Sequence, residues 1–175
     1  MKAQKRDRGW FSKVFVFAAL LTTMGGGTAR AQEIVVGAQT GGLGTVDYPG
    51  SEKSTIAFGP FVKVNPYGWA AFKLDATFGH FDGGSYFSSS PAVQLNPIAY
   101  EEFSLGFIGG AGFYKLPSRS LRFGLNGGVS GDFALTNHLS VGMEARYHTV
   151  FDSPNIWNVF LTLGYSFETG GDWDW

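Results

Sequence analysis

The chain has 175 residues, with 13 Lys and Arg, 14 Asp and Glu, 26 Gly, 17 Phe and no Cys. This length suits a single domain. Charged residues make up only 15% of the chain, well below the usual quarter. The absence of Cys excludes disulfide frameworks, thiolate zinc sites and Cys nucleophiles. The near-neutral charge balance provides no stripe of Lys and Arg for phosphates, so we expect no nucleic acid among the partners.

Residues 1–31 have the pattern of a secretory signal peptide. A basic segment ends at Lys13, and the apolar stretch Val14–Met24 that follows is too short to span a bilayer. The small residues Ala29 and Ala31 then provide a cleavage site before Gln32. The alternative, a short buried helix, leaves the basic flank and the small-residue site unexplained. Cleavage would leave a net charge near −6, and an exported chain without Cys indicates a bacterial envelope protein.

Beyond Gln32 the sequence alternates between apolar and polar residues, with the period of two that is typical of β-strands. In the segment 140–148, for example, Val141, Met143 and Tyr147 share one face, whereas Glu144 and Arg146 share the other. No apolar run approaches eighteen residues, so no membrane-spanning helix is predicted. The alternating segments are 56–64, 70–79, 103–113, 121–135, 140–148 and 157–167.

The distribution of charge decides which face of these strands is the inside. In every alternating segment the charges lie on the face rich in small residues, and the opposite face is bulky and apolar. A soluble barrel would then show water almost only Gly, Ser, Thr and Asn, which is poor for solubility. With the apolar face turned toward lipid, the small and charged residues fill a narrow polar lumen. Backbone groups in lipid must all be paired, so the sheet has to close.

Turn signals at seven places divide the chain into eight strands. They are Thr40–Ser54, Asn65–Gly68, Asp82–Ser85, Asn96–Glu102, Leu116–Ser120, Thr136–His138 and Asp152–Asn155. The fourth strand, around 86–95, is interrupted by Ser88–Pro91. The predicted fold is therefore all-β, an eight-stranded antiparallel transmembrane β-barrel with both ends in the periplasm. Eight strands leave a lumen that side chains can fill, so we expect a plugged lumen and no diffusion pore.

Two groups of residues are assigned roles by this arrangement, and neither role is catalytic. Ionised side chains in a confined lumen need partners. The expected lumenal charge network is Lys63, Lys73, Asp75, Arg122, Asp132, Glu144, Arg146 and His148. Aromatic side chains near strand ends suit the two membrane interfaces. The expected aromatic girdle is Trp69, Trp157, Tyr147, Tyr165 and Phe167. Three dispersed His predict no metal site, and no cofactor is expected.

From Phe103 onward the chain resembles the small outer-membrane β-barrels of the OmpA/OmpX type. The similarity rests on the segments Gly109–Tyr114, Phe123–Val129, Leu135–His148 and Leu161–Phe167. It implies the bacterial outer membrane, contact with outer-membrane lipid and lipopolysaccharide, and handling by the barrel-assembly machinery. Such barrels end at an aromatic residue, here Phe167, which bounds the barrel at 32–167 and leaves Glu168–Trp175 as a short periplasmic tail or Trp175 as the end signal. We expect no peptidoglycan-binding domain after the barrel.

The expected function is a non-enzymatic structural or surface-interaction role. One alternative is a lipid-modifying hydrolase similar to lipid A deacylases, whose site needs a His and a nearby Ser on the outward side. His148 lacks a following His-x-Ser pattern, His138 and Ser140 have the spacing but fall at a predicted periplasmic turn, and His80 is interpreted as an interface residue. A second alternative is a periplasmic lipocalin-like ligand-binding barrel, which the polar lumen disfavours. A third, an assembly partner, would rest on the Trp-rich tail.

Overall fold

The computed structural model describes residues 33–46, 54–81, 83–100 and 102–168. The predicted signal peptide and residues 169–175 of the predicted tail lie outside these ranges. The described residues form eight strands: β1 (Glu33–Val46), β2 (Ser54–Tyr67), β3 (Ala70–Phe81), β4 (Gly84–Ala99), β5 (Phe103–Lys115), β6 (Arg122–Ala134), β7 (Leu139–Val150) and β8 (Asn155–Glu168). This part of the chain contains no helix long and apolar enough to cross a membrane.

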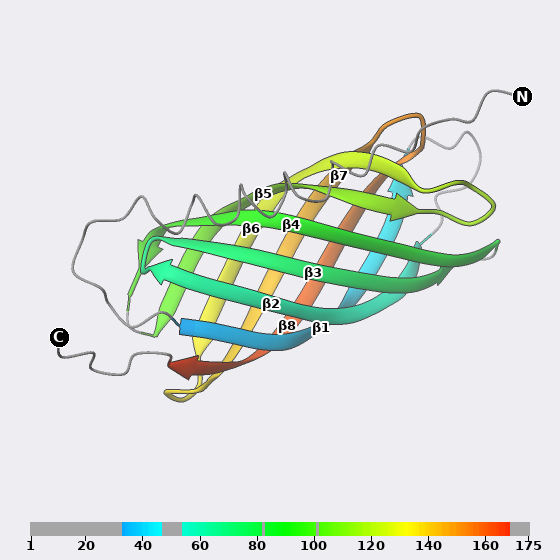
Figure 1. Cartoon of the computed structure of the whole chain (residues 1–175). Coiled ribbons are helices and arrows are strands. Elements are labelled where there is room, and N and C mark those ends of the chain that lie inside the picture. Colours follow the sequence, from blue (N-terminus) through cyan, green and yellow to red (C-terminus); the bar gives the residue numbers. More distant parts are fainter. Residues whose placement is uncertain (1–32, 47–53, 82, 101, 169–175) are drawn as a thin grey trace, which may run out of the picture.

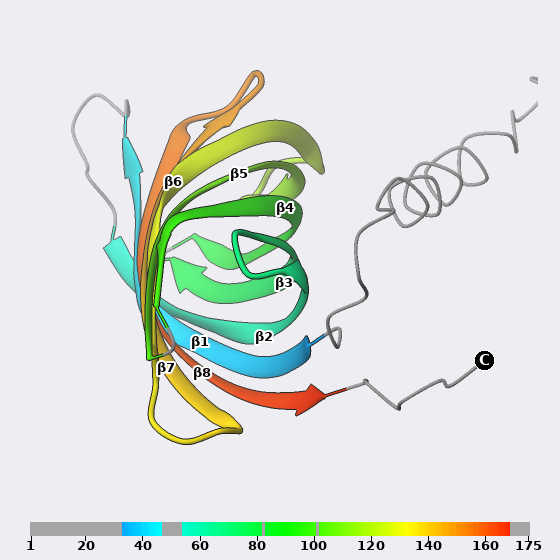
Figure 2. The same cartoon turned by 90° about the vertical axis from the view of Figure 1, so that its left-hand side faces the viewer.

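The strands close into a barrel in which each pairs with its neighbours in sequence, and β1 pairs with β8 (Figures 1 and 2). All pairs are antiparallel, and the closing pair runs in unbroken register from Glu33↔Glu168 to Val46↔Asn155. Closure leaves no unpaired sheet edge. The predicted all-β, eight-stranded antiparallel barrel is therefore confirmed.

The two ends of the barrel differ and are named here for later use. The odd-numbered strands run toward the loop end, where β3 joins β4, β5 joins β6 and β7 joins β8. The even-numbered strands run back to the turn end, which also holds the start of β1 and the end of β8 (Figure 1).

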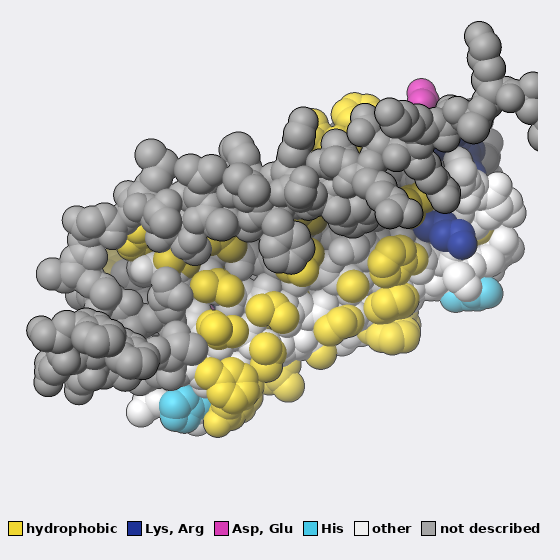
Figure 3. All heavy atoms as spheres, viewed as in Figure 1, with side chains coloured by type: hydrophobic (Ala, Val, Ile, Leu, Met, Phe, Trp, Pro, Cys, Tyr) yellow, Lys and Arg dark blue, Asp and Glu magenta, His cyan; other side chains and the backbone are white. Residues whose placement is uncertain are grey.

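The alternation of side chains follows the predicted inside-out arrangement. On β7 and β8, Met143 and Leu161 are 59% and 64% exposed on the outer surface, whereas the adjacent Glu144 is 4% exposed in the lumen. Hydrophobic side chains cover the visible outer wall between the two ends (Figure 3). An apolar exterior around a charged interior is the arrangement of a barrel surrounded by lipid.

The predicted break beginning at Thr40 is wrong, because β1 continues to Val46. Its glycines relieve crowding inside the strand instead of forming a turn. A Cβ added at Gly41 would clash with the carbonyl oxygen of Val159, and one at Gly44 would lie 2.5 Å from the indole ring of Trp157. The glycine-rich run therefore lets β1 pack closely on β8.

The predicted interruption of the fourth strand is also wrong, since β4 runs unbroken through Ser88–Pro91. Ser88 and Ser90 are 3% and 1% exposed and face the lumen, whereas Pro91 is exposed on the outer surface. The Ser90 hydroxyl accepts a hydrogen bond of 2.6 Å from the Asn126 amide on β6. The serines are thus polar lining of the lumen, and their small size does not mark a turn.

Candidate functional site

The centre of the lumen holds four buried charges from two strands. Lys73 Nζ lies 2.8 Å from Glu144 Oε2, and Arg146 contacts both Glu144 Oε1 at 2.6 Å and Asp75 Oδ2 at 2.9 Å. All four side chains are at most 5% exposed. Two cations and two anions balance, as buried charges require. We call Lys73, Asp75, Glu144 and Arg146 the central ion cluster.

Two of these ion pairs, Lys73–Glu144 and Arg146–Asp75, cross the full width of the barrel, and the third, Arg146–Glu144, lies within one strand. Lys73 and Asp75 stand on β3 and Glu144 and Arg146 on β7, which are four positions apart around a ring of eight strands. The strand period of two places each pair of charges on the lumenal face. Side chains from opposite walls therefore meet at the axis and block it.

A second charged layer lies beside the central ion cluster, toward the turn end. Lys63 Nζ on β2 lies 3.1 Å from Asp132 Oδ2 on β6, and the Gln94 amide donates to the same oxygen at 3.1 Å. The Lys63 and Asp132 side chains are 11% and 23% exposed. An internal cavity between the two layers has a volume of about 10 Å³, close to the space of one water molecule.

His148 extends the polar network toward the loop end. Its Nδ1 lies 2.9 Å from the Tyr114 hydroxyl, and its Nε2 lies 2.9 Å from the Asn158 amide nitrogen. The Asn126 amide donates to the Tyr114 hydroxyl at 3.3 Å. Both ring nitrogens are engaged, so this His has the surroundings of a structural residue. Among the described residues, no group of three His, Cys, Asp or Glu side chains could hold a metal ion.

Arg122 lies apart from the other residues expected in the lumenal network. It begins β6 at the loop end, its side chain is 40% exposed, and its Nη1 lies 3.6 Å from Asp152 Oδ2 in the β7–β8 connection. Arg122 is on the lumenal face of β6, as the alternation of the sequence indicates, but it lies at the rim of the barrel and not at the depth of the central ion cluster. Strand parity fixes the face of a residue and not its depth, which explains the difference.

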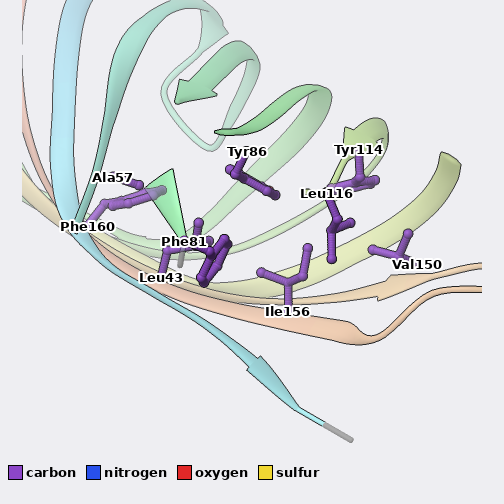
Figure 4. Close-up of a cluster of buried hydrophobic side chains, with 9 residues drawn as sticks. All are labelled: Leu43, Ala57, Phe81, Tyr86, Tyr114, Leu116, Val150, Ile156 and Phe160. Atoms are coloured by element: carbon purple, nitrogen blue, oxygen red, sulfur yellow. The ribbon is translucent and has the colours of Figure 1, made fainter. Parts of the chain in front are cut away.

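An apolar layer fills the lumen at the loop end and was not predicted from the sequence. Its side chains converge on the interior from several strands (Figure 4). We call this set the apolar plug: Leu43, Ala57, Phe81, Tyr86, Tyr114, Leu116, Val150, Ile156 and Phe160. Leu43, Tyr114 and Ile156 have no exposed surface. The only sequence signal was a few large apolar residues on the polar face, such as Phe160 between Asn158 and Thr162.

The residues expected in the aromatic girdle divide between the two ends. Tyr147 and Trp157 are direct cross-strand partners near the loop end. Trp69 lies in the β2–β3 turn and stacks on Tyr67 with ring centroids 5.7 Å apart. The other two, Tyr165 and Phe167, pack edge to face at 5.0 Å near the end of β8. All five are at least 38% exposed.

Comparison with known proteins gives structural matches alone. No protein-family model matches the chain, and neither does any curated protein sequence. Among solved structures, the N-terminal β-barrel domain of OprF from Pseudomonas aeruginosa superposes with a TM-score of 0.59 at 11% identity, covering 80% of this chain and all of that one. OprG from the same organism gives 0.57 at 13% identity, covering 82% of this chain and 99% of that one.

A third match is Ail, the attachment invasion locus protein of Yersinia pestis. It gives a TM-score of 0.54 at 15% identity and covers 79% of this chain and 99% of its own. Identities this low speak for the fold alone. The chain has the fold of the small eight-stranded outer-membrane β-barrels.

Proposed function

We propose that the protein is a bacterial outer-membrane β-barrel with a closed lumen, which acts through its outer surface and its rim and not as an enzyme or a diffusion pore. The observation that carries this proposal is the set of ion pairs across the barrel. Lys73–Glu144, Arg146–Asp75 and Lys63–Asp132 each join strands on opposite walls. With the axis blocked, the outer wall and the rims are the surfaces left for interaction.

The location in the outer membrane is supported by three observations. The outer wall is apolar around its circumference, the sequence carries the pattern of a secretory leader, and the structural neighbours OprF, OprG and Ail are small barrels of the same architecture. Lipid and lipopolysaccharide are then the immediate partners of the outer wall. The barrel-assembly machinery would act on the last strand, where Phe167 is the penultimate residue.

The test joins cell fractionation with gel mobility and conductance. We expect the protein in the outer-membrane fraction, with a band that shifts on boiling because a closed barrel resists detergent at room temperature. In planar bilayers the purified protein should show no stable open channel. A periplasmic protein with no mobility shift would contradict the membrane assignment, and a stable conductance would contradict the closed lumen.

The lipocalin-like alternative has little support from the interior. An apolar ligand needs a concave apolar cavity of several hundred cubic ångströms. The cavity beside the central ion cluster has a volume of about 10 Å³ and is lined by Lys63, Lys73 and Glu144 among others. The apolar part of the lumen is occupied by the side chains of the apolar plug.

A second candidate function, a lipid hydrolase, rests on one observation. His80 and Ser85 are direct cross-strand partners in the β3–β4 hairpin, and both are exposed on the outer wall at the loop end. This is the side on which the hydrolase alternative needs a His and a Ser. The test is mass spectrometry of lipid A from a deletion strain complemented with wild type or with His80→Ala. Lipid A of lower mass in the strain with wild type, but not in the strain with His80→Ala, would establish the hydrolase. Identical lipid A spectra from the two strains would exclude it.

A further inference from the structure

The outer wall has a groove over strands β4 to β8, which lie side by side in the barrel (Figure 1). The groove has a volume of about 680 Å³, within the range of about 300–1,000 Å³ that is usual for ligand sites. Ile98 and Phe103 line it at the turn end, where β4 ends and β5 begins. Ala145 and Val159 line it farther along β7 and β8. The groove therefore runs from the turn-end rim into the middle of the wall.

The hollow shape of this groove depends on a glycine of β6. Gly131 faces outward between its direct cross-strand partners, Leu105 of β5 and Met143 of β7. Both partners are exposed and project from the wall. All three residues line the groove. A glycine between two projecting apolar side chains leaves the space that forms its floor.

We propose that this groove binds an acyl chain of a phospholipid whose headgroup carries a primary ammonium group, and that Glu102 binds the ammonium group. The inference rests on the proposed outer-membrane location, in which the turn end faces the periplasm because an even strand number leaves both chain ends there. A lipid that enters from the turn-end rim belongs to the periplasmic leaflet. The proposed function thereby gains a lipid class and a binding site.

An acyl chain is the occupant that an apolar groove within the membrane favours. Atoms that line a void lose their dispersion contacts, so an unfilled groove is unfavourable. Lipid tails are as apolar as leucine side chains, and the fit of the chain decides the binding and not the hydrophobic effect. A chain in the groove would lie against Phe107, Val129 and Leu161.

A second hollow in the wall adjoins the groove and favours a lipid with two chains. It lies over β1, β2, β7 and β8, has a volume of about 720 Å³, and shares Val141 and Leu161 with the groove. Ala38 and Pro60 belong to its lining. A phospholipid has two acyl chains, and the two adjacent hollows provide a place for each.

Glu102 lies at the mouth of the groove. It directly precedes Phe103, and its side chain is exposed. The Ala134 N–H donates to the Glu102 carbonyl and the Tyr100 N–H donates to the Phe103 carbonyl, both at 2.8 Å, so the backbone is held at the rim. The ion pairs of the described residues do not include Glu102. An ammonium group offers three hydrogen-bond donors to such a carboxylate, whereas a choline headgroup offers none.

The test is native mass spectrometry of the protein extracted from membranes in detergent. The probes are phosphatidylethanolamine, phosphatidylcholine and phosphatidylglycerol with the same acyl chains. We expect phosphatidylethanolamine to bind best, by up to about fivefold over phosphatidylcholine, which is the range of an exposed ion pair. Glu102→Gln should remove this preference and leave the binding of phosphatidylcholine unchanged.

Gly131→Leu tests the groove itself, because a leucine at this position occupies the hollow. The matched control is Gly127→Leu, which adds the same side chain to the outer face of the same strand at a residue that does not line the groove. Gly131→Leu should bind all three lipids more weakly, and Gly127→Leu should bind them as wild type does. Ala145→Leu fills the groove from β7 and is the second groove variant. The shift of the gel band on boiling verifies that each variant is folded.

Equal lipid binding by the two groove variants and the control, or equal binding of the three headgroups by wild type, would overturn the inference. So would a lipid-free dimer that Gly131→Leu abolishes, because the groove would then belong to a contact between two copies of the chain. Fractionation separates the two proposals: a protein found in the outer membrane whose lipid binding does not depend on the groove refutes only this site.

Discussion

Glu144 is the residue on which the central ion cluster depends most. It contacts both cations, at 2.8 Å from Lys73 and 2.6 Å from Arg146. Without its charge, Asp75 is left to balance two buried cations. The Gln39 side-chain oxygen, 3.2 Å from Lys73 Nζ, carries no charge. An uncompensated buried charge is costly even where the intact pair adds little net stability.

We predict that Glu144→Gln lowers the free energy of unfolding by about 3–5 kcal/mol. The measurement is guanidinium unfolding in lipid vesicles, followed by tryptophan fluorescence. The matched control is Asp132→Asn, whose partly exposed pair with Lys63 should cost about 1 kcal/mol or less. Similar losses in the two variants would show that burial does not set the energy of these pairs.

Adjacent glycines on β6 make a second prediction at this scale. A Cβ on Gly128 would clash with the carbonyl oxygen of Ala145 and lie 2.8 Å from Cα of Arg146. A Cβ on Gly127, which faces outward, would have the Ile108 carbonyl oxygen as its nearest contact, at 3.9 Å. Gly128→Ala should therefore destabilise the barrel by about 1–3 kcal/mol.

Gly127→Ala should change stability by less than about 0.5 kcal/mol. The two variants are compared by the temperature at which the gel band shifts to its unfolded mobility. Each variant adds one methyl group, and the two positions are adjacent on β6. Any general effect of replacing glycine by alanine in this strand is therefore the same in both variants and cancels in the comparison. A lower transition temperature for Gly127→Ala than for Gly128→Ala would refute the close approach of β6 and β7.

At the scale of the strand, alternation predicts six of the eight elements and their faces, namely β2, β3 and β5 to β8. The pattern around Met143 and Glu144 specifies both strand type and orientation, because a shift of one residue would bring every charge of β7 into lipid. It failed in β1 and β4, where glycines and serines have the composition of a turn. In β1 those small residues accommodate Trp157 and Phe160 of the neighbouring strand, a contact that no local pattern reveals.

The ion pairs across the lumen could not be predicted from the sequence, for a different reason. Lys73 and Glu144 are 71 residues apart, and their meeting depends on the register of every intervening strand pair. The sequence places both in the lumen but gives no relative depth. The same missing quantity moved Arg122 from the expected network to the rim. The apolar plug was missed because isolated residues such as Ile156 do not alter the period of a strand.

Strand β8 provides a prediction that separates lumenal packing from contact with lipid. Phe160 is 1% exposed in the apolar plug, and the next residue, Leu161, is 64% exposed on the outer wall. Phe160→Ala should lower the free energy of unfolding by about 3–5 kcal/mol, because it leaves a cavity in a packed interior. Leu161→Ala exchanges one lipid contact for another and should cost far less. Equal losses in vesicle unfolding would refute the plug as a packed layer.

For the whole molecule, the lumen consists of three layers with different access to solvent. The layer of Lys63 and Asp132 is partly exposed toward the turn end. Beyond it lie the buried central ion cluster and then the apolar plug, which closes the loop end (Figure 4). Solvent therefore reaches the lumen from one side only, which in the proposed orientation is the periplasm.

The absence of Cys from the chain allows this one-sided access to be measured with single thiols. Thr162 is half-buried beside the cavity near Lys63, whereas Ser88 is 3% exposed beside Tyr86 and Tyr114. In micelles, a small methanethiosulfonate reagent should modify Thr162→Cys rapidly. It should modify Ser88→Cys only as fast as the barrel opens, because a packed layer without voids admits no reagent.

Ser88→Cys replaces a hydroxyl by a thiol, and Thr162→Cys in addition removes one methyl group at a half-buried position, so both changes in the lumen are small. Denaturation should bring the two rates together, which verifies that both thiols are intact. Equal rates in the folded protein would mean that the apolar plug does not seal the loop end, and the lumen would then be continuous from one side of the membrane to the other. A large ratio of rates locates the seal between the levels of Thr162 and Ser88, where the central ion cluster and the plug meet.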